Sequence, residues 1–221
     1  MNEILTQFKR VFTPEEEAQL FAPPATEAEI EELKKACKIW GVELPEVFYD
    51  FYRWHNGSRY DEKLRQFMPL NEYEVVYSIS KIITVKEEWD KKEAEGLFKD
   101  FSPGTMWNKG WIPFVEQEYC WLIVFDTIGS YSGNPNQLIG FHYTSLKIKL
   151  MLHSHFEQWI KTMLELKKQN LLYLLPNDEG QFYQFNSVDD NARAEIFLTI
   201  NKGEAKEIDM RQFLKPGKSF Y

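Results

Sequence analysis

Apolar residues recur at helical spacing in two neighbouring segments near the start of the chain. The first segment has four of them at steps of three or four: Ile30, Leu33, Cys37 and Trp40. This spacing places them on one face of an α-helix. Thr26 and Glu29 have the spacing of a capping box at the start of that helix, and Gly41 suits its left-handed end. The pattern predicts a helix that faces the core.

A second helix is predicted directly after a short corner at residues 42–44. Pro45 suits its first position, because a proline there loses no helical hydrogen bond. Its apolar face would consist of Val47, Phe48, Phe51 and Tyr52. Asn56-Gly57 is a signal for the end of this helix. Since the corner is short, we expect the two helices to pack against each other.

The residues ahead of these helices also have helical signals. Residues 1–12 place apolar side chains near helical spacing, which predicts a short docking helix. Thr13, Pro14 and Glu16 then form a capping box with proline at the first helical position. Residues 1–25 are therefore predicted to be an N-terminal helical arm.

Two more helices are predicted further along the chain. The mixed-charge run over residues 86–95 is typical of a solvated helix. Ser154 and Glu157 have the spacing of a third capping box, and they precede an apolar helical face at residues 156–164. The second of these helices is expected to pack on the core.

Strands are predicted where aromatic and β-branched residues gather. The predicted ranges are residues 67–80, 111–114, 119–126, 138–143 and 146–152, with a loop at residues 58–66. Helical periodicity remains an alternative after Asn71. Residues 120–125 are apolar without alternation, which is typical of a central strand covered on both faces. In residues 146–152, apolar residues alternate with lysines, which predicts a half-exposed strand.

The last 50 residues differ from the preceding segments in their predicted secondary structure. Residues 171–175, 181–185 and 194–200 are predicted to be short strands separated by turns. Together with the order of the preceding elements, this predicts an α+β fold: a central, mainly antiparallel sheet, with two N-terminal helices and one later helix packed on it. We expect a main domain at residues 26–170 and a β-rich extension of the same domain at residues 171–221.

The composition and net charge of the chain limit the classes of function that it can have. The chain has 221 residues, of which 16% are aromatic, and this predicts a folded globular protein. A net charge of −8 argues against nonspecific nucleic-acid binding and permits a basic partner. No apolar run is long enough to span a membrane, and no signal peptide is evident at the start. Cys37 and Cys120 are expected to be free thiols, which predicts a cytoplasmic location.

No motif for catalysis or cofactor binding is found. His153 and His155 flank Ser154, but a closed zinc site needs four ligands and no cluster supplies the others. Cys37 and Cys120 lie in apolar runs, where thiols are unreactive. We therefore expect no enzyme activity, no metal and no cofactor, with an uncharacterised hydrolase as the least favoured alternative.

Four local patterns, taken in order, resemble a known family. They are Thr26 to Ile30 at a helix start; Leu44-Pro45 with Phe48, Phe51, Asn56 and Gly57; Trp111 to Phe114 with a strand ending at Asp126; and Ser154 to Trp159. Over about residues 26–168, they resemble the SUKH superfamily, which includes fungal regulators of cell-wall glucan synthesis and many bacterial immunity proteins. Ser58 departs from the pattern, because the family often has a further glycine there.

The resemblance implies a compact α+β fold that binds proteins and has no shared catalytic residues. Bacterial members often neutralise a toxin, commonly a nuclease, by direct binding. This chain is accordingly expected to be an immunity protein, monomeric or homodimeric, that binds a basic toxin domain and neither nucleic acid nor membrane. The alternative is a regulatory scaffold in cell-wall synthesis or signalling.

Partner contacts are predicted among aromatic and acidic residues in loops and at element ends. Exposed aromatics anchor protein interfaces, and acidic side chains attract a basic partner. The candidates are Trp54, Tyr60, Asp61, Glu62, Glu116, Glu118 and Asp126. The acidic candidates lie after the Asn-Gly helix end, around the turn before the central strand, and at the end of that strand.

Overall fold

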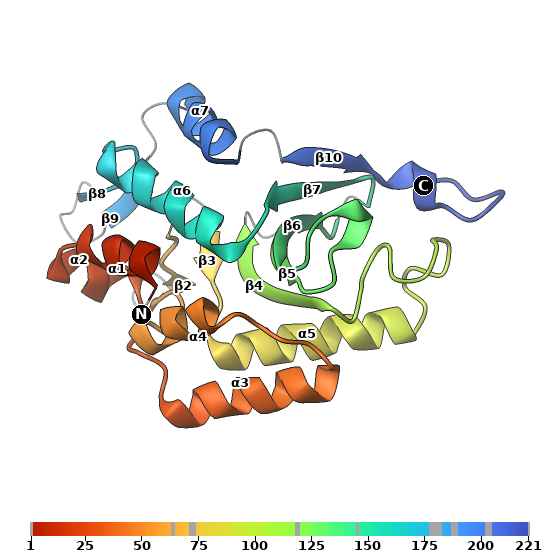
Figure 1. The fold of residues 1–221 in the computed structure, drawn as a ribbon, viewed down its shortest axis with the longest axis horizontal. Helices are drawn as coiled ribbons and strands as arrows, with labels where there is room; N and C mark the ends of the chain where they lie inside the picture. Colours follow the sequence, from red (N-terminus) through yellow and green to blue (C-terminus); the bar gives the residue numbers. More distant parts are fainter. Residues whose placement is uncertain are drawn as a thin grey trace.

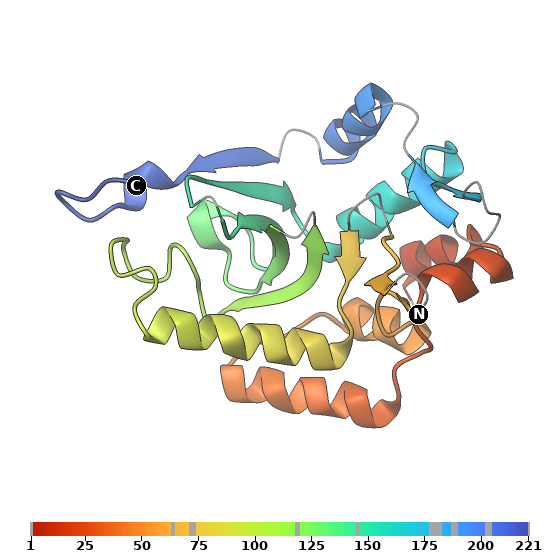
Figure 2. The same cartoon turned by 180° about the vertical axis from the view of Figure 1, so that it is seen from behind.

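The computed structural model describes residues 2–62, 65–70, 74–117, 120–144, 146–176, 183–186, 190–201 and 205–220. Within these ranges the chain forms a six-stranded antiparallel sheet with helices on both faces (Figure 1 and Figure 2). The combination of helices with a main antiparallel sheet confirms the predicted α+β class.

The strands of the main sheet follow the spatial order β10-β7-β6-β5-β4-β3. They are β3 (Glu74–Val76), β4 (Trp111–Gln117), β5 (Trp121–Asp126), β6 (Gln137–His142), β7 (Ile148–His153) and β10 (Lys206–Asp209). β5 pairs with β4 and β6, and five of its six residues are buried. Its continuous apolar run confirms the predicted central strand, because both of its faces are covered.

Helices cover the two faces of this sheet. On one face, α4 (Glu46–Trp54) and α6 (Phe156–Lys168) bring Phe48 and Phe156 against the ring of Phe125. On the other face, α5 (Ile79–Ala94) packs Trp89 against Phe141. α3 (Glu27–Trp40) lies along the outer side of α5 (Figure 1). α1 (Glu3–Arg10) packs on α6 and is followed by α2 (Pro14–Leu20).

Local capping signals were correct at two helix starts and wrong at a third. Thr13 and Thr26 both form complete capping boxes, and Gly41 ends α3 at φ +70°. Ser154 does not cap α6. The N-cap is His155, whose side chain makes no capping hydrogen bond, because the chain stays extended through His155 and the helix begins one residue later.

The predicted strand at residues 67–80 is replaced by shorter elements. Among its described residues, only Gln66–Phe67 and Glu74–Val76 contribute strands, and α5 begins at Ile79 after Ser78 caps it. The mixed-charge helix therefore starts earlier than residue 86. It is also not uniformly solvated, since Lys86 is fully buried and binds Asp90.

β7 presents an unexpected face to the core. Lys149 is fully buried, donates a hydrogen bond of 2.7 Å to the Met106 carbonyl and lies over the Phe141 ring, whereas Ile148 is 37% exposed. Burial lowers the pKa of Lys149 well below its ordinary value. The predicted half-exposed strand is present, but its burial does not alternate: a lysine is the fully buried residue, and Leu150, Met151 and Leu152 are all half-buried.

The C-terminal segment was predicted only in part. β8 (Tyr173–Pro176) and β9 (Tyr183–Asn186) pair with each other in a separate sheet, close to two predicted strands. Residues 194–200 are not a strand, because they belong to the helix α7 (Asp190–Asn201). β10 then joins the main sheet at its edge beside β7. The predicted turn at residues 177–180 lies outside the described residues. Of the turn predicted at residues 201–204, only Asn201 is described, and it is the last residue of α7.

Candidate functional site

The candidate site is built on the junction formed by Asn56 and Gly57. Asn56 Nδ2 donates a hydrogen bond of 2.8 Å to Glu29 at the start of α3, and Asn56 Oδ1 accepts one of 2.9 Å from the backbone N–H of Ile79 at the start of α5. The backbone N–H of Asn56 also binds the Pro23 carbonyl. One short polar side chain thus fixes the relative positions of three helices.

Gly57 is required by the geometry of this junction. Its φ is +83°, a conformation that side chains rarely adopt, and an added Cβ would lie 2.7 Å from backbone atoms of Val76 and Tyr77. Its carbonyl accepts a hydrogen bond of 3.0 Å from the N–H of Ala22. The chain therefore turns tightly against β3 as it leaves α4.

A small hairpin follows the junction and is held by its first residues. It pairs β1 (Tyr60–Asp61) with β2 (Gln66–Phe67). The N–H of Ser58 donates to the Val76 carbonyl at 2.8 Å. Arg59 binds the backbone at the end of α2 through its own N–H and its guanidinium. The base of the hairpin is therefore fixed to both β3 and α2.

Two aromatic rings are exposed on this hairpin. Tyr60 and Phe67 face each other across the strand pair with ring centroids 5.1 Å apart, and they are 42% and 46% exposed. Glu62 is exposed at the same hairpin. We call Tyr60, Glu62 and Phe67 the hairpin surface. The sequence pointed to Tyr60 and Glu62 but missed Phe67, because its aromatic-rich surroundings resemble a buried strand.

Asp61 has a structural role within the hairpin. It is 8% exposed, and its carboxylate accepts a hydrogen bond of 2.9 Å from Arg59. Asp61 thus helps to hold the base of the hairpin, while the neighbouring Glu62 remains exposed.

Trp54 joins the N-terminal arm to α4. Its half-buried ring packs against Phe8, Phe12 and Phe21. Its Nε1 donates a hydrogen bond of 3.1 Å to Glu17 of α2. The predicted aromatic anchor is therefore already engaged in an internal contact between α4 and the helices that precede it.

Glu116 lies within β4 and is bound by two tyrosines. Its carboxylate accepts hydrogen bonds of 3.0 Å from the Tyr77 hydroxyl and 3.3 Å from the Tyr143 hydroxyl. Burial and the negative charge of Glu116 raise the pKa of Tyr143 to about 12. Glu116 therefore organises two phenols at a half-buried position. Glu118 lies outside the described residues.

Asp126 is fully buried at the end of β5. Its carboxylate accepts hydrogen bonds from Trp111 Nε1 at 3.1 Å, the Ser130 backbone N–H at 2.6 Å and Gln137 Nε2 at 2.7 Å. Through these hydrogen bonds, the Asp126 carboxylate holds together the residues of the turn between β5 and β6. We do not propose Asp126 as a partner contact, because it has no exposed surface.

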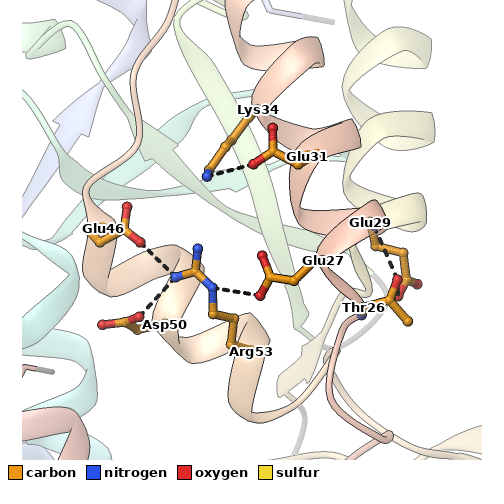
Figure 3. Close-up of polar contacts among 8 residues, drawn as sticks. All are labelled: Thr26, Glu27, Glu29, Glu31, Lys34, Glu46, Asp50 and Arg53. Carbon is orange, nitrogen blue, oxygen red and sulfur yellow. Dashed lines mark hydrogen bonds and ion pairs between the residues drawn. The ribbon is translucent and has the colours of Figure 1, made fainter.

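An acidic face, made by Glu27, Glu46 and Asp50, lies where α3 meets α4. Arg53 binds three carboxylates, those of Glu27 at 3.2 Å, Glu46 at 2.7 Å and Asp50 at 3.0 Å (Figure 3). One guanidinium cannot neutralise three carboxylates, so this face keeps a negative charge. The shared arginine also joins the two helices across the short corner between them.

The described residues gather no set of metal ligands, and one of the two thiols is buried. Among the described residues, no group of three or more His, Cys, Asp and Glu side chains is placed to hold a metal ion. Cys37 is buried, and burial raises the pKa of its thiol to about 11. Within the same ranges, no helix has both the length and the apolar character needed to cross a bilayer.

Comparison with known proteins gives one clear result. No curated protein matched the chain. A family model, that of the SMI1/KNR4 family (SUKH-1), matches residues 24–162. The matched range contains the junction, the hairpin, the acidic face and the strands from β3 to β7. Because it covers more than half of the sequence, the chain belongs to the SMI1/KNR4 family (SUKH-1).

Proposed function

We propose that this chain is a non-enzymatic protein-binding module that neutralises a basic toxin domain by covering part of its surface. The observation that carries the proposal is the exposed pair of Tyr60 and Phe67 on an anchored hairpin. Tyrosine and other aromatic residues are enriched at the energetic centres of protein interfaces. The hairpin surface is the proposed centre of the contact.

Family membership supports a binding role. The SUKH family includes immunity proteins and SMI1/KNR4-like regulators, and its members are generally non-catalytic binding modules. The proposal that the partner is a toxin goes one step beyond this general binding role. It rests on the exposed aromatics together with the charge of the surrounding elements.

The charge distribution favours a basic partner. Residues 1–62 contain thirteen Asp and Glu residues and seven Lys and Arg residues, so they carry most of the net charge of −8. Unlike charges increase the rate of protein association and fix the orientation of the encounter. The acidic face on α3 and α4 belongs to this segment (Figure 3). Binding is therefore expected to weaken as salt concentration rises.

The anchored base of the hairpin favours tight binding. Ser58, Arg59 and Gly57 fix the chain at the point where the hairpin begins. A surface that is ordered before binding loses less conformational entropy when the partner docks.

We also propose a cytoplasmic location. Cys37 and Cys120 are both free thiols, the first buried and the second half-buried. Free thiols persist in a reducing compartment. The oligomeric state is proposed to be a monomer or a homodimer.

A regulatory scaffold is the second candidate function. It is favoured by the name of the matching family model, since the family includes regulators as well as immunity proteins. A scaffold binds several partners in one assembly, whereas an immunity protein binds one toxin tightly.

Affinity capture from the native host, followed by co-expression, separates these functions. The tagged chain is used as bait, beside a Tyr60→Ala/Phe67→Ala variant and an Ile39→Ala control. Ile39 is 83% exposed and lies on α3, which is not part of the hairpin. Captured proteins are then expressed in the host with and without the chain, and growth is measured.

The immunity proposal predicts one basic partner that is lost from the double variant and kept by Ile39→Ala. That partner should arrest growth alone, and the chain should restore growth. Several partners and no growth arrest would favour the scaffold. Recovery of housekeeping proteins only would refute the immunity function, and equal capture by the double variant would refute the hairpin as its contact.

A further inference from the structure

A cavity of about 310 Å³ lies at the C-terminal end of the molecule. Its wall comes from three segments: the loop after α5, the loop before β7 and the last residues described. The principal lining residues are Leu97, Phe101, Leu146, Lys147, Leu214 and Phe220. Most of this lining is apolar. Leu97 is 55% exposed, so apolar surface also reaches solvent here.

The C-terminal segment is fixed in place over this cavity. The N–H of Ser102 donates to the Phe213 carbonyl at 2.8 Å, and the N–H of Lys215 donates to the Asp100 carbonyl at 2.9 Å. The rings of Phe101 and Phe220 lie 5.6 Å apart. The cavity is therefore a built feature of the fold, made where the end of the chain returns to α5.

The charges around the cavity favour an anion. Asp100 also lines it, but Lys218 lies 2.8 Å away, and their hydrogen bond holds the pKa of Asp100 below its ordinary range. Lys147 has an exposed side chain and forms no ion pair with any described residue. Residues 205–220 contain four Lys and Arg residues against two Asp and Glu residues. This end is locally basic in an acidic protein.

We propose that this cavity binds a small carboxylate with an apolar aromatic or aliphatic body. The apolar body would contact Phe101, Leu146 and Phe220, and the carboxylate would pair with the Lys147 ammonium at the rim. Ligand pockets commonly have volumes of about 300–1,000 Å³, so a group of one or two rings suits this one. A mostly apolar lining with a few placed polar or charged groups is the usual composition of such sites.

This site is independent of the proposed toxin contact. The hairpin and the C-terminal segment lie toward opposite ends of the longest axis (Figure 1 and Figure 2). The two sites also differ in charge, since one favours a basic protein and the other an anionic small molecule. An experiment that refutes one of the two proposals would therefore not refute the other.

The test uses 2-naphthoate and its uncharged amide as probes, titrated into the full chain by isothermal calorimetry and protein-observed NMR. Lys147→Gln removes the charge at the rim and keeps similar length. Ser219→Trp fills the opening from an exposed lining position. Lys99→Gln is the control, because Lys99 is an exposed lysine beside the cavity that does not line it.

We expect saturable naphthoate binding at least fivefold tighter than amide binding. Lys147→Gln should abolish that preference, Ser219→Trp should abolish the binding of both probes, and Lys99→Gln should change neither. Absence of saturable binding at millimolar probe, or unchanged binding in Ser219→Trp, would overturn the cavity site. Equal affinity of the native chain for both probes would overturn the carboxylate assignment.

Discussion

Gly57 shows how a single residue controls the candidate site. Its positive φ lets the chain turn against β3 at the end of α4, and the lack of a Cβ lets the backbone approach Val76 and Tyr77 closely. Gly41 has a similar φ of +70°, but nothing lies within 4 Å of its missing Cβ. A substitution at Gly41 therefore introduces backbone strain alone, whereas a substitution at Gly57 introduces backbone strain and steric overlap.

The first prediction compares alanine at these two positions. Gly41→Ala should lower the free energy of unfolding by about 1–2 kcal/mol, because only the left-handed conformation is penalised. Gly57→Ala should lower it by roughly 2–5 kcal/mol, because overlap with the backbone adds to that strain. Denaturant unfolding measures both. Equal losses of unfolding free energy at the two positions would show that β3 moves away from the new Cβ without loss of stability, and would contradict the predicted overlap.

His153 links β7 to α7 through buried contacts. Its Nδ1 lies 2.9 Å from Asn201 Oδ1, and its ring packs edge-on against Phe197. Asn201 Nδ2 donates to the Phe197 carbonyl, so Oδ1 is the atom that faces the histidine. Burial, the largest cause, lowers the pKa of His153 from its ordinary value near 6.5 to about 4.

The second prediction concerns stability in acid. Between pH 6.5 and 4 the unfolded state binds the His153 proton and the folded state does not, so stability falls as pH falls. At pH 5 the loss from this residue should be about 2 kcal/mol relative to pH 7.5. His153→Gln should lose less stability than the native chain over this range. Parallel pH profiles for the two proteins, measured by urea unfolding, would contradict this.

At the scale of elements, α7 shows where local sequence misleads. Residues 194–200 are rich in β-branched and aromatic side chains, which favour a strand. In a strand, Ile196, Leu198 and Ile200 would share one face. The structure buries Ile196 and Ile200 at 8% exposure and leaves Leu198 57% exposed, as a helix requires. Packing of this helix against α6 overrides the local preference.

The third prediction uses this periodicity. Ile196→Ala and Ile200→Ala should each lower the free energy of unfolding by about 2 kcal/mol or more, because each leaves a cavity. Leu198→Ala should stay within about 0.5 kcal/mol of the native chain. Thermal or denaturant unfolding gives the comparison. A similar loss at all three positions would support the strand instead.

The elements that were predicted correctly have local causes. The capping boxes at Thr13 and Thr26 depend on residues three apart, so the sequence displays them directly. The burial of Lys149 and Asp126 depends on partners far away in the chain, such as Met106 and Gln137. The same limit applies to the candidate site: the sequence names Tyr60 and Glu62 as candidates, but it does not show that Phe67 is exposed, because that exposure depends on the hairpin.

At the scale of the whole molecule, the two ends carry different surfaces. The N-terminal helices and the hairpin form an acidic end with exposed aromatics, and the C-terminal segment forms a basic end with a cavity. The main sheet separates them (Figure 1). This arrangement allows one module to bind a basic protein at one end while the other end remains accessible.

The affinity of the captured partner for the hairpin variant tests the central claim most directly. Calorimetry or surface plasmon resonance should show that Tyr60→Ala/Phe67→Ala raises Kd at least about 100-fold. The reason is that the variant lacks both aromatic side chains at the centre of the proposed interface. The Ile39→Ala control should stay within about threefold of the native chain, because surface contacts outside the centre contribute little. Unfolding measurements on the same samples establish that both variants are folded. A Kd unchanged in the double variant would contradict the account.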